Sequence, residues 1–263
     1  MKKITLKIAA LYKTFSGDDW VRYSIESIYD NVDAIYFVHS NVSWLGERGN
    51  TCIKVVEDWK NKYDKDKKII TIVGDFQSQD LQYVVGMKVI KSGNFDWVLL
   101  VDTDEIWSME RLLYVRKYLE TNPEYDAFSC SMFTHIKEPK YIVWPPEPCR
   151  PTVLIRSNVE SMVGVRGNRQ PKKGNLRDVY FNHLTLVRKK EQDIFTKIIA
   201  SNSADGETHV NLKKWKKTVW DRIPNVNNFH MTKGYEHCWE SIKEVEIKDG
   251  ILKRITEELK WKA

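Results

Sequence analysis

Apolar and polar positions follow two rhythms through the first half of the chain. Apolar, β-rich runs occupy residues 4–11, 34–39, 67–73 and 97–101. Apolar residues recur at helical spacing over residues 20–29, 51–63, 80–92 and 110–120. Strands that alternate with helices build parallel sheets through right-handed βαβ units. The pattern therefore predicts an α/β fold with an open, mostly parallel sheet flanked by helices.

The second half of the chain is less regular. We expect strands over 126–134 and 179–187, and helices over 189–201 and from Asp249 onward. Most of the prolines lie between residues 138 and 151, which predicts a loop with a restricted backbone. Residues 161–178 are rich in glycine and basic side chains and predict a second loop.

Length and composition agree with a globular protein that has a sizeable core. The chain has 263 residues, of which 42% are hydrophobic and 30% charged. We expect a main α/β domain over residues 1–205 and a smaller, mainly helical C-terminal extension over residues 206–263. No apolar run approaches the roughly 20 residues of a transmembrane helix. A cytoplasmic protein is expected, and contact with a membrane surface stays open.

Charge and cysteine usage narrow the partners only slightly. The chain has 42 Lys and Arg against 36 Asp and Glu, a formal net charge of +6 that favours anionic partners. The cysteines are widely spaced, without a Cys-x-x-Cys pair, so we interpret them as structural thiols. They are Cys52, Cys130, Cys149 and Cys238.

The strongest chemical signal follows the apolar run from Trp97 to Val101. This run is typical of a central parallel strand, and it ends in Asp102, Thr103 and Asp104. Open α/β sheets bind ligands beyond the carboxyl ends of their strands. Two carboxylates one residue apart can converge on one cation. Mg²⁺ and Mn²⁺ take such ligands and leave other coordination positions for phosphate oxygens. The same pattern in an exposed turn would have no function, but its position after a buried strand favours a metal and diphosphate site.

The segment N-F-D-W-V-L-L-V-D-T-D-E-I-W, residues 94–107, resembles the DxD segment of GT-A fold glycosyltransferases, particularly their family-2-like branch. The resemblance spans roughly residues 4 to 200. It implies a metal-dependent enzyme that moves a sugar from a nucleoside diphosphate sugar, such as a UDP-sugar, to an acceptor hydroxyl. A bacterial or phage glycan is the acceptor that the resemblance favours.

The resemblance also implies roles for individual residues. Asp102 would contact the ribose or the metal, and Asp104 would be the main ligand of Mn²⁺ or Mg²⁺. Tyr12, Lys13 and Asp75 would hold the base and ribose. His183 would complete the metal site, although a core histidine is an equally good interpretation and His230 is a rival.

The base that would activate the acceptor hydroxyl is less clear. An inverting transferase usually employs a carboxylate. Glu147, Glu191 and Asp205 are the candidates, and no spacing distinguishes any of them from an ordinary surface acid. A retaining enzyme would do without such a base.

Two basic segments leave further partners open. The stretch from Arg150 to Arg177 could close over a diphosphate or remain a solvated loop. Residues 213–217, K-K-W-K-K, could contact nucleic acid or a membrane, but an amphipathic helix that buries Trp215 is the favoured interpretation. Hydroxylated DNA as acceptor, a nucleotidyltransferase and a non-catalytic binding module are the alternative functions. A nucleotidyltransferase should carry a glycine-rich phosphate loop, which residues 13–18 match poorly.

Overall fold

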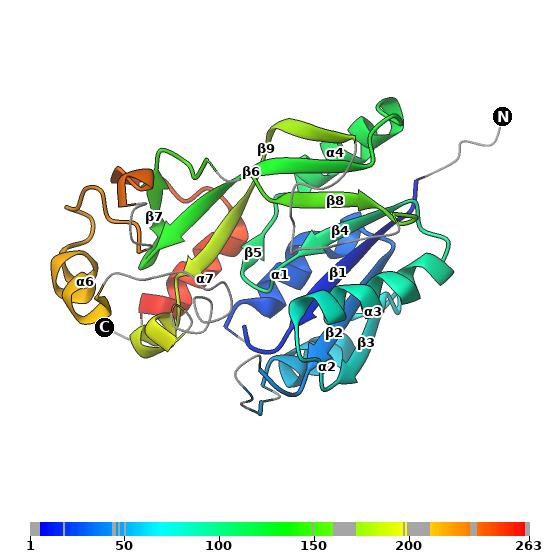
Figure 1. The fold of residues 1–263 in the computed structure, drawn as a ribbon, viewed down its shortest axis with the longest axis horizontal. Coiled ribbons are helices and arrows are strands. Elements are labelled where there is room, and N and C mark those ends of the chain that lie inside the picture. The colour runs from blue at the N-terminus through cyan, green and yellow to red at the C-terminus, as the bar shows by residue number, and fades with distance from the viewer. Residues whose placement is uncertain are drawn as a thin grey trace. The chain divides into compact units, whose positions relative to one another are not determined.

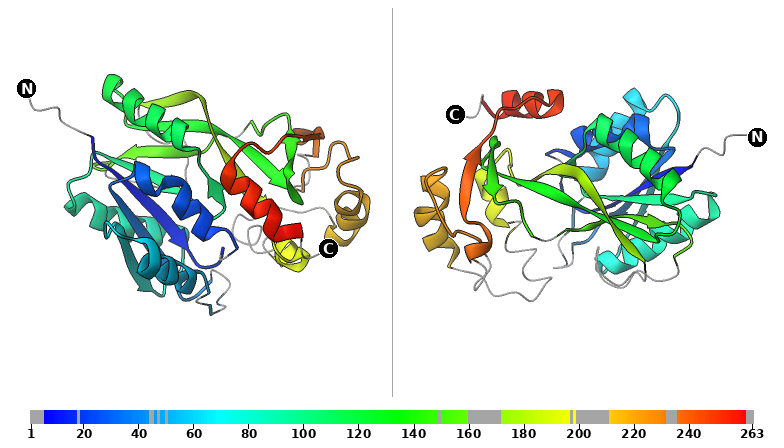
Figure 2. Two further views of the ribbon diagram at one scale, coloured as in Figure 1. Left: turned by 180° about the vertical axis from the view of Figure 1, so that it is seen from behind. Right: turned by 90° about the horizontal axis from the view of Figure 1, so that it is seen from above.

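A computed structural model describes residues 6–17, 19–43, 46, 48–49, 51–148, 150–159, 172–196, 198, 211–231 and 236–260. The chain forms two compact units (Figures 1 and 2). Unit 1 comprises Met1–Cys130 and Pro151–Val179, and unit 2 comprises Ser131–Arg150 and Tyr180–Ala263. Strands β6 and β9 contribute residues to both units. The boundary expected near residue 205 lies outside the described residues and stays a prediction.

Unit 1 contains the alternating strands and helices that the apolar pattern predicts. Its elements are β1 (Ile8–Thr14), α1 (Val21–Ile28), η1 (Tyr29–Asn31), β2 (Ala34–Ser40), α2 (Thr51–Tyr63), β3 (Ile69–Gly74), α3 (Gln79–Ser92), β4 (Trp97–Val101), β5 (Glu105–Ile106), α4 (Met109–Thr121), β8 (Thr152–Arg156), and the first parts of β6 (Ala127–Ile136) and β9 (Lys173–Leu186). The expected α/β class is confirmed.

Four neighbouring strands of unit 1 are parallel. Strands β3, β2, β1 and β4 lie side by side in parallel, and Leu11 of β1 pairs with Tyr36 of β2 and Leu100 of β4. Strand β8 runs antiparallel between β4 and β6. The four parallel strands therefore present their carboxyl ends along one edge.

Helices cover both faces of these strands. Figure 1 shows α3 in front of the parallel strands, and the view from behind in Figure 2 shows α1 and α2 on the other face. The close fit of α3 depends on Gly86, because a Cβ there would lie 2.5 Å from the Cδ1 of Leu11. The core on this face contains Leu11, Tyr36, Val38, Leu100, Tyr83, Met87 and Ile90.

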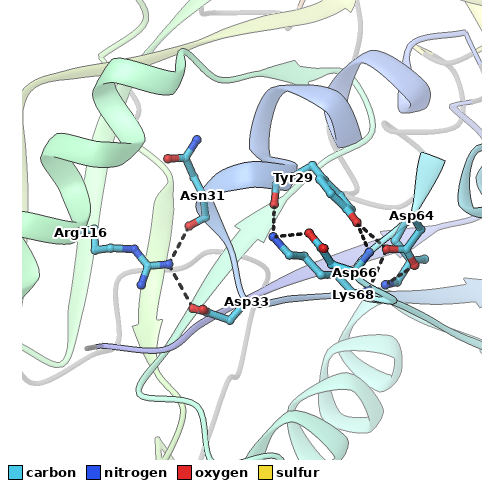
Figure 3. A network of polar contacts seen from close by, with 8 residues as sticks. Tyr29, Asn31, Asp33, Asp64, Asp66, Lys68 and Arg116 are labelled. Carbon is cyan, nitrogen blue, oxygen red and sulfur yellow. Dashed lines mark hydrogen bonds and ion pairs between the residues drawn. The ribbon is translucent and has the colours of Figure 1, made fainter. Parts of the chain in front are cut away.

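Ionic and polar contacts hold the amino edge of the same strands (Figure 3). Arg116 of α4 donates to the Asn31 carbonyl at 3.0 Å and to Asp33 Oδ2 at 3.1 Å. Asp33 Oδ2 also accepts the backbone N–H of Ile8 at 2.8 Å, where β1 begins. The carboxylate thus supplies an acceptor that the end of the ladder lacks.

A second group at this edge is built around Asp64. Its carboxylate accepts the Tyr29 hydroxyl at 2.8 Å and the backbone N–H groups of Lys68 at 2.8 Å and Ile69 at 2.9 Å. Burial raises the pKa of Tyr29 to about 12, so its hydroxyl keeps the proton that it donates. Lys68 Nζ donates to the Tyr29 carbonyl at 3.0 Å. These bonds fix the turn that leads into β3.

Unit 2 is antiparallel and is made from two distant stretches of sequence. It contains the later parts of β6 and β9 together with β7 (Glu138–Trp144), α6 (Leu212–Thr218), η2 (Trp220–Arg222), η3 (Glu236–Cys238), β10 (Ser241–Glu244) and α7 (Gly250–Lys260). Strand β7 pairs antiparallel with both β6 and β10. Residues 191–196 are also helical.

The core of unit 2 is aromatic. Trp215, Trp220, Phe229 and Trp239 are nearly fully buried. The indole N–H of Trp215 donates to the Phe229 carbonyl at 2.8 Å, which satisfies its polar atom. The interpretation of residues 213–217 as an amphipathic helix with a buried tryptophan is therefore confirmed.

Two loop predictions were wrong in part. Residues 138–144 form β7, because the apolar residues Tyr141, Ile142 and Val143 are buried against unit 2 neighbours and the prolines fall mainly after the strand. Residues 173–178 belong to β9, and residues 160–171 lie outside the described residues.

Two expectations from composition can also be compared with the structure. Cys52 and Cys130 are buried and Cys238 is partly exposed, and Cys149 lies outside the described residues. Among the described helices, none is long and apolar enough to span a membrane.

Candidate functional site

The polar side chains of unit 1 gather where the parallel strands end. In the order β4, β1, β2, β3, the edge carries Asp102, Lys13, His39 and Asp75. Neighbouring strands lie about 4.8 Å apart, so the edge is roughly 14 Å wide across the three strand spacings from β4 to β3. This edge can therefore accommodate an extended ligand, as the carboxyl ends of open sheets commonly do.

The carboxylates after β4 lie in a tight turn and not along an extended strand. The backbone N–H of Glu105 donates to the Asp102 carbonyl at 3.1 Å, and the Ser24 hydroxyl donates to the same carbonyl at 3.3 Å. Asp104 and Glu105 are 2% and 1% exposed. The turn thus exposes part of Asp102 and buries Asp104 beside it.

Lys13 supplies a cation directly at this turn. Its Nζ lies 3.0 Å from Asp102 Oδ1, and the two side chains are 12% and 30% exposed. The ammonium also lies 5.6 Å from the centre of the Tyr83 ring. The structure therefore brings together two of the residues expected to contact the donor, and it pairs opposite charges that are both accessible to a ligand.

Gly17 allows the chain after β1 to approach the turn. It has φ +108°, a conformation that favours glycine, and a Cβ at this position would lie 2.0 Å from Thr103 Oγ1. Any other residue would both strain the backbone and displace Thr103. The segment after β1 and the Asp102–Asp104 turn are therefore fitted to each other.

A buried amide holds the ends of β1 and β2. Gln82 of α3 donates through Nε2 to the Thr14 carbonyl at 3.0 Å and to the Val38 carbonyl at 2.8 Å. Beside it, the Thr14 hydroxyl lies 3.0 Å from His39 Nδ1. Burial lowers the pKa of His39, which keeps the ring neutral. These contacts fix the ends of β1 and β2 relative to each other and to α3.

Asp75 forms the far end of the edge. Its carboxylate accepts Asn41 Nδ2 at 3.1 Å and Arg48 Nη2 at 3.3 Å. Asp75 and Arg48 are 53% and 74% exposed at the side chain. Exposed ion pairs of this kind contribute little to stability, so both groups are available for binding.

The side chain of Tyr12 belongs to the core. It is fully buried, its ring stacks on Phe37 with centroids 4.4 Å apart, and its hydroxyl lies 2.9 Å from Ser24 Oγ. Burial raises the pKa of Tyr12. Its neighbour Lys13, and not Tyr12, presents a polar group at the edge.

Two of the candidate bases lie in unit 2 and have contrasting environments. Glu147 is hydrogen bonded to the hydroxyl of Thr134, and burial raises its pKa. Glu191 forms an ion pair with Lys216 at 2.8 Å and accepts the indole N–H of Trp220 at 3.1 Å. Lys216 lowers the pKa of Glu191. Glu191 is therefore bound in a network of charged side chains, whereas the carboxylate of Glu147 is shielded from solvent and hydrogen bonded to a neutral hydroxyl.

The remaining candidates are placed by the structure or lie outside it. His183 lies on β9 in unit 2, with its ring centroid 6.2 Å from that of Phe181. The ring centroid of His230 lies 4.4 Å from that of Trp239. Asp205 falls outside the described residues, as do Arg166 and Arg169 of the basic stretch.

The donor set at the turn suits a hard divalent cation only in part. Within the described ranges, no group of three or more His, Cys, Asp and Glu side chains is arranged to hold a metal ion. Mg²⁺ is often bound through one or two carboxylates and completed by substrate phosphates. Asp102 is partly exposed and Asp104 is 2% exposed. The roles of Asp102, Asp104 and His183 as metal ligands stay predictions.

Sequence reasoning did not single out three residues that shape the edge. Gly17 could have been found, because a glycine in the turn after the first strand is a usual sign of close backbone approach. Gln82 and His39 give no such sign, since a polar residue on the buried face of a helix or strand resembles any other polar residue in the sequence.

No family model and no curated protein matches the chain. Among solved structures, S. aureus TarS (residues 1–349) is similar at 12% identity and a TM-score of 0.45, over 76% of this chain and 66% of that one. In complex with UDP, the same protein matches at 15% identity and a TM-score of 0.37, over 49% of this chain and 36% of that one.

A further similar structure is 4-diphosphocytidyl-2C-methyl-D-erythritol synthase from Anaerococcus prevotii, with 14% identity and a TM-score of 0.45 over 75% of this chain and 97% of that one. At these identities, and with TM-scores below 0.5, the likenesses identify neither a family nor a substrate for this chain.

Proposed function

We propose that the chain is a metal-dependent glycosyltransferase that binds a nucleoside diphosphate sugar, such as a UDP-sugar, at the carboxyl edge of β4, β1, β2 and β3. The observation that carries the proposal is the turn after β4, where Asp102 is ion-paired with Lys13 at 3.0 Å and adjoins the buried Asp104. A cation and two carboxylates at the ligand-binding edge of a parallel sheet suit a diphosphate and its metal.

The nucleoside and the diphosphate would occupy opposite ends of the edge. Asp75 and Arg48 offer exposed hydrogen-bonding groups for the base or ribose. Lys13 offers an ammonium for a phosphate oxygen, and a charged donor makes the stronger kind of hydrogen bond to such an oxygen. The width of roughly 14 Å from β4 to β3 leaves room for a ligand that reaches both Asp102 and Asp75.

Asp104 and Asp102 would hold Mn²⁺ or Mg²⁺ together with the phosphates. When bound, such an ion stabilises the charge that develops on the departing diphosphate. Asp102 already has Lys13 as a counter-ion at 3.0 Å, so the side chain is held in position in the free protein. Gly17 and Ser24 support the turn, which limits the reorganisation that binding requires.

Glu147 is the candidate base that its environment favours. A carboxylate with a raised pKa accepts a proton more readily near neutral pH than an ordinary surface carboxylate. Thr134 fixes the orientation of Glu147 through its hydroxyl. The acceptor would be a hydroxyl group on a glycan.

A screen of nucleotide sugars tests the proposal. Wild-type protein should release the nucleoside diphosphate from at least one sugar donor in the presence of Mn²⁺ or Mg²⁺, and chelation should stop the release. Asp104→Asn is the matched variant, since it removes one charge without changing side-chain size. Release that continues after chelation, or that Asp104→Asn leaves unchanged, would contradict the proposal.

A further inference from the structure

Helix α4 of unit 1 exposes an apolar stripe on the side opposite to its buried residues. Met109, Leu113 and Tyr114 are 54%, 57% and 49% exposed. The opposite side of the helix buries Leu112, Val115 and Leu119 in the core. Apolar side chains that lie next to one another on the exposed side of a helix can mark an interaction site.

The orientation of this stripe is fixed by the contacts of α4. Arg116 leaves the helix toward the sheet and binds Asp33 and the Asn31 carbonyl (Figure 3). Its Nη1 also donates to the carbonyl of Leu6 at 2.5 Å. Since α4 is tied to η1 and to the chain before β1, rotation of the helix cannot hide the stripe.

Two exposed charges of opposite sign lie on the same stripe. Glu110 and Lys117 are seven residues apart, which is about 10.5 Å along a helix and too far for an ion pair between them. In the part of the chain that the structure describes, no ion pair joins either residue to another side chain. The stripe therefore carries a negative charge at one end, Leu113 and Tyr114 at its centre, and a positive charge at the other end.

We infer that this stripe binds the same stripe of a second copy of the chain, with the two α4 helices antiparallel. A two-fold axis between Leu113 and Tyr114 places Glu110 opposite Lys117 of the second copy, and Lys117 opposite its Glu110. Leu113 then faces Tyr114 of the second copy. An isologous contact must be self-complementary, and this order of charges satisfies that requirement. A parallel pairing would set like charges against each other.

The size of the stripe determines how strong the contact can be. Thirteen residues form a helix about 20 Å long, and a single helix face buries less surface than a standard stable interface. The dimer is therefore weak and depends on protein concentration. Because the charges are exposed, higher salt weakens it further.

Sedimentation velocity over a concentration series tests the inference with full-length protein. Wild type should shift from monomer to dimer between about 1 and 500 µM, which spans the dissociation constants of weak complexes. Glu110→Lys and Lys117→Glu should each raise the dissociation constant by about tenfold, because each creates two like-charge contacts. The double variant E110K/K117E should restore wild-type association, since the charges are exchanged on both copies.

A charge control separates this contact from a general effect of net charge. Lys88→Glu, on the exposed side of α3, changes the net charge as Lys117→Glu does and should leave association unchanged. Wild type that stays monomeric throughout the series, or a double variant that associates no better than either single variant, would overturn the inference. Circular dichroism verifies that each variant is folded.

Discussion

The two edges of the parallel strands in unit 1 use carboxylates in different ways. At the amino edge, Asp33 and Asp64 accept backbone N–H groups at 2.8–2.9 Å, and Arg116 adds a side-chain pair to Asp33 at 3.1 Å. At the carboxyl edge, Asp102 and Asp75 are paired with the side chains of Lys13 and Arg48. Backbone donors cannot move without unfolding the turn, whereas lysine and arginine side chains can. The comparison indicates that the amino edge maintains the fold and that the carboxyl edge is able to exchange its partners for a ligand.

The largest expected effect separates the edges by activity. Asp104→Asn should reduce metal-dependent release of the nucleoside diphosphate by about 100-fold or more, because one charged metal ligand becomes neutral. Initial rates over a Mn²⁺ titration give the measurement. Its control is Asp64→Asn, which alters a carboxylate of the amino edge and should leave the rate unchanged below the melting temperature. An equal loss of activity in both variants would contradict the assignment of binding to the carboxyl edge and of a structural role to the amino edge.

The next effect separates the edges by stability. Asp64→Ala removes the acceptor of Tyr29, Lys68 and Ile69 and should lower the free energy of unfolding by about 2–3 kcal/mol. Denaturation in urea measures this change. Asp75→Ala, at the exposed carboxyl edge, should change the free energy by less than about 0.5 kcal/mol. Equal destabilisation by the two variants would show that both edges are structural.

A smaller effect concerns the cation at the carboxyl edge. Lys13→Met should weaken UDP binding in the absence of metal by about tenfold, because the phosphate loses a charged donor. The same variant should bind Mn²⁺ more tightly without UDP, since Asp102 loses the ammonium that competes for it. Calorimetry measures both affinities. Lys13→Met with unchanged affinity for both ligands would mean that the ion pair only supports the turn.

The smallest effect depends on pH and concerns Glu147. Burial raises its pKa in the folded protein above the ordinary value of about 4.3, so the folded state binds the proton more tightly. The stability that this proton supplies is full below the ordinary pKa and is lost as the pH rises through the raised pKa. Glu147→Gln should therefore melt at a higher temperature than wild type at alkaline pH and at the same temperature in acid. Parallel melting curves across the pH range would contradict this.

The sequence predicted unit 1 far better than unit 2. Helix α2 and strand β4 begin and end where the apolar pattern places them, because each βαβ element is contiguous in sequence and packs against its neighbours. Unit 2 joins residues 131–150 to residues 180–263. Its strand β7 is stabilised by β6 and β10, and β10 lies about 100 residues away in sequence, so local patterns contain little of the information.

In the candidate site, too, only the features that depend on local sequence could be predicted. The chemistry of Asp102 and Asp104 could be anticipated, because it depends on residue types beside a recognisable strand. The burial of Tyr12 and the pairing of Lys13 with Asp102 could not be anticipated. Both depend on which face of the sheet each side chain occupies near the end of β1. Gln82 reaches Thr14 and Val38 only through tertiary packing.

Calorimetric titration of UDP, with and without Mn²⁺, tests the central claim most directly. Wild-type protein should bind UDP at least about tenfold more tightly when Mn²⁺ is present, and Asp104→Asn should lose that difference. Equal affinity of the wild type under both conditions, or an undiminished effect of Mn²⁺ in Asp104→Asn, would contradict a metal and diphosphate site at the turn after β4.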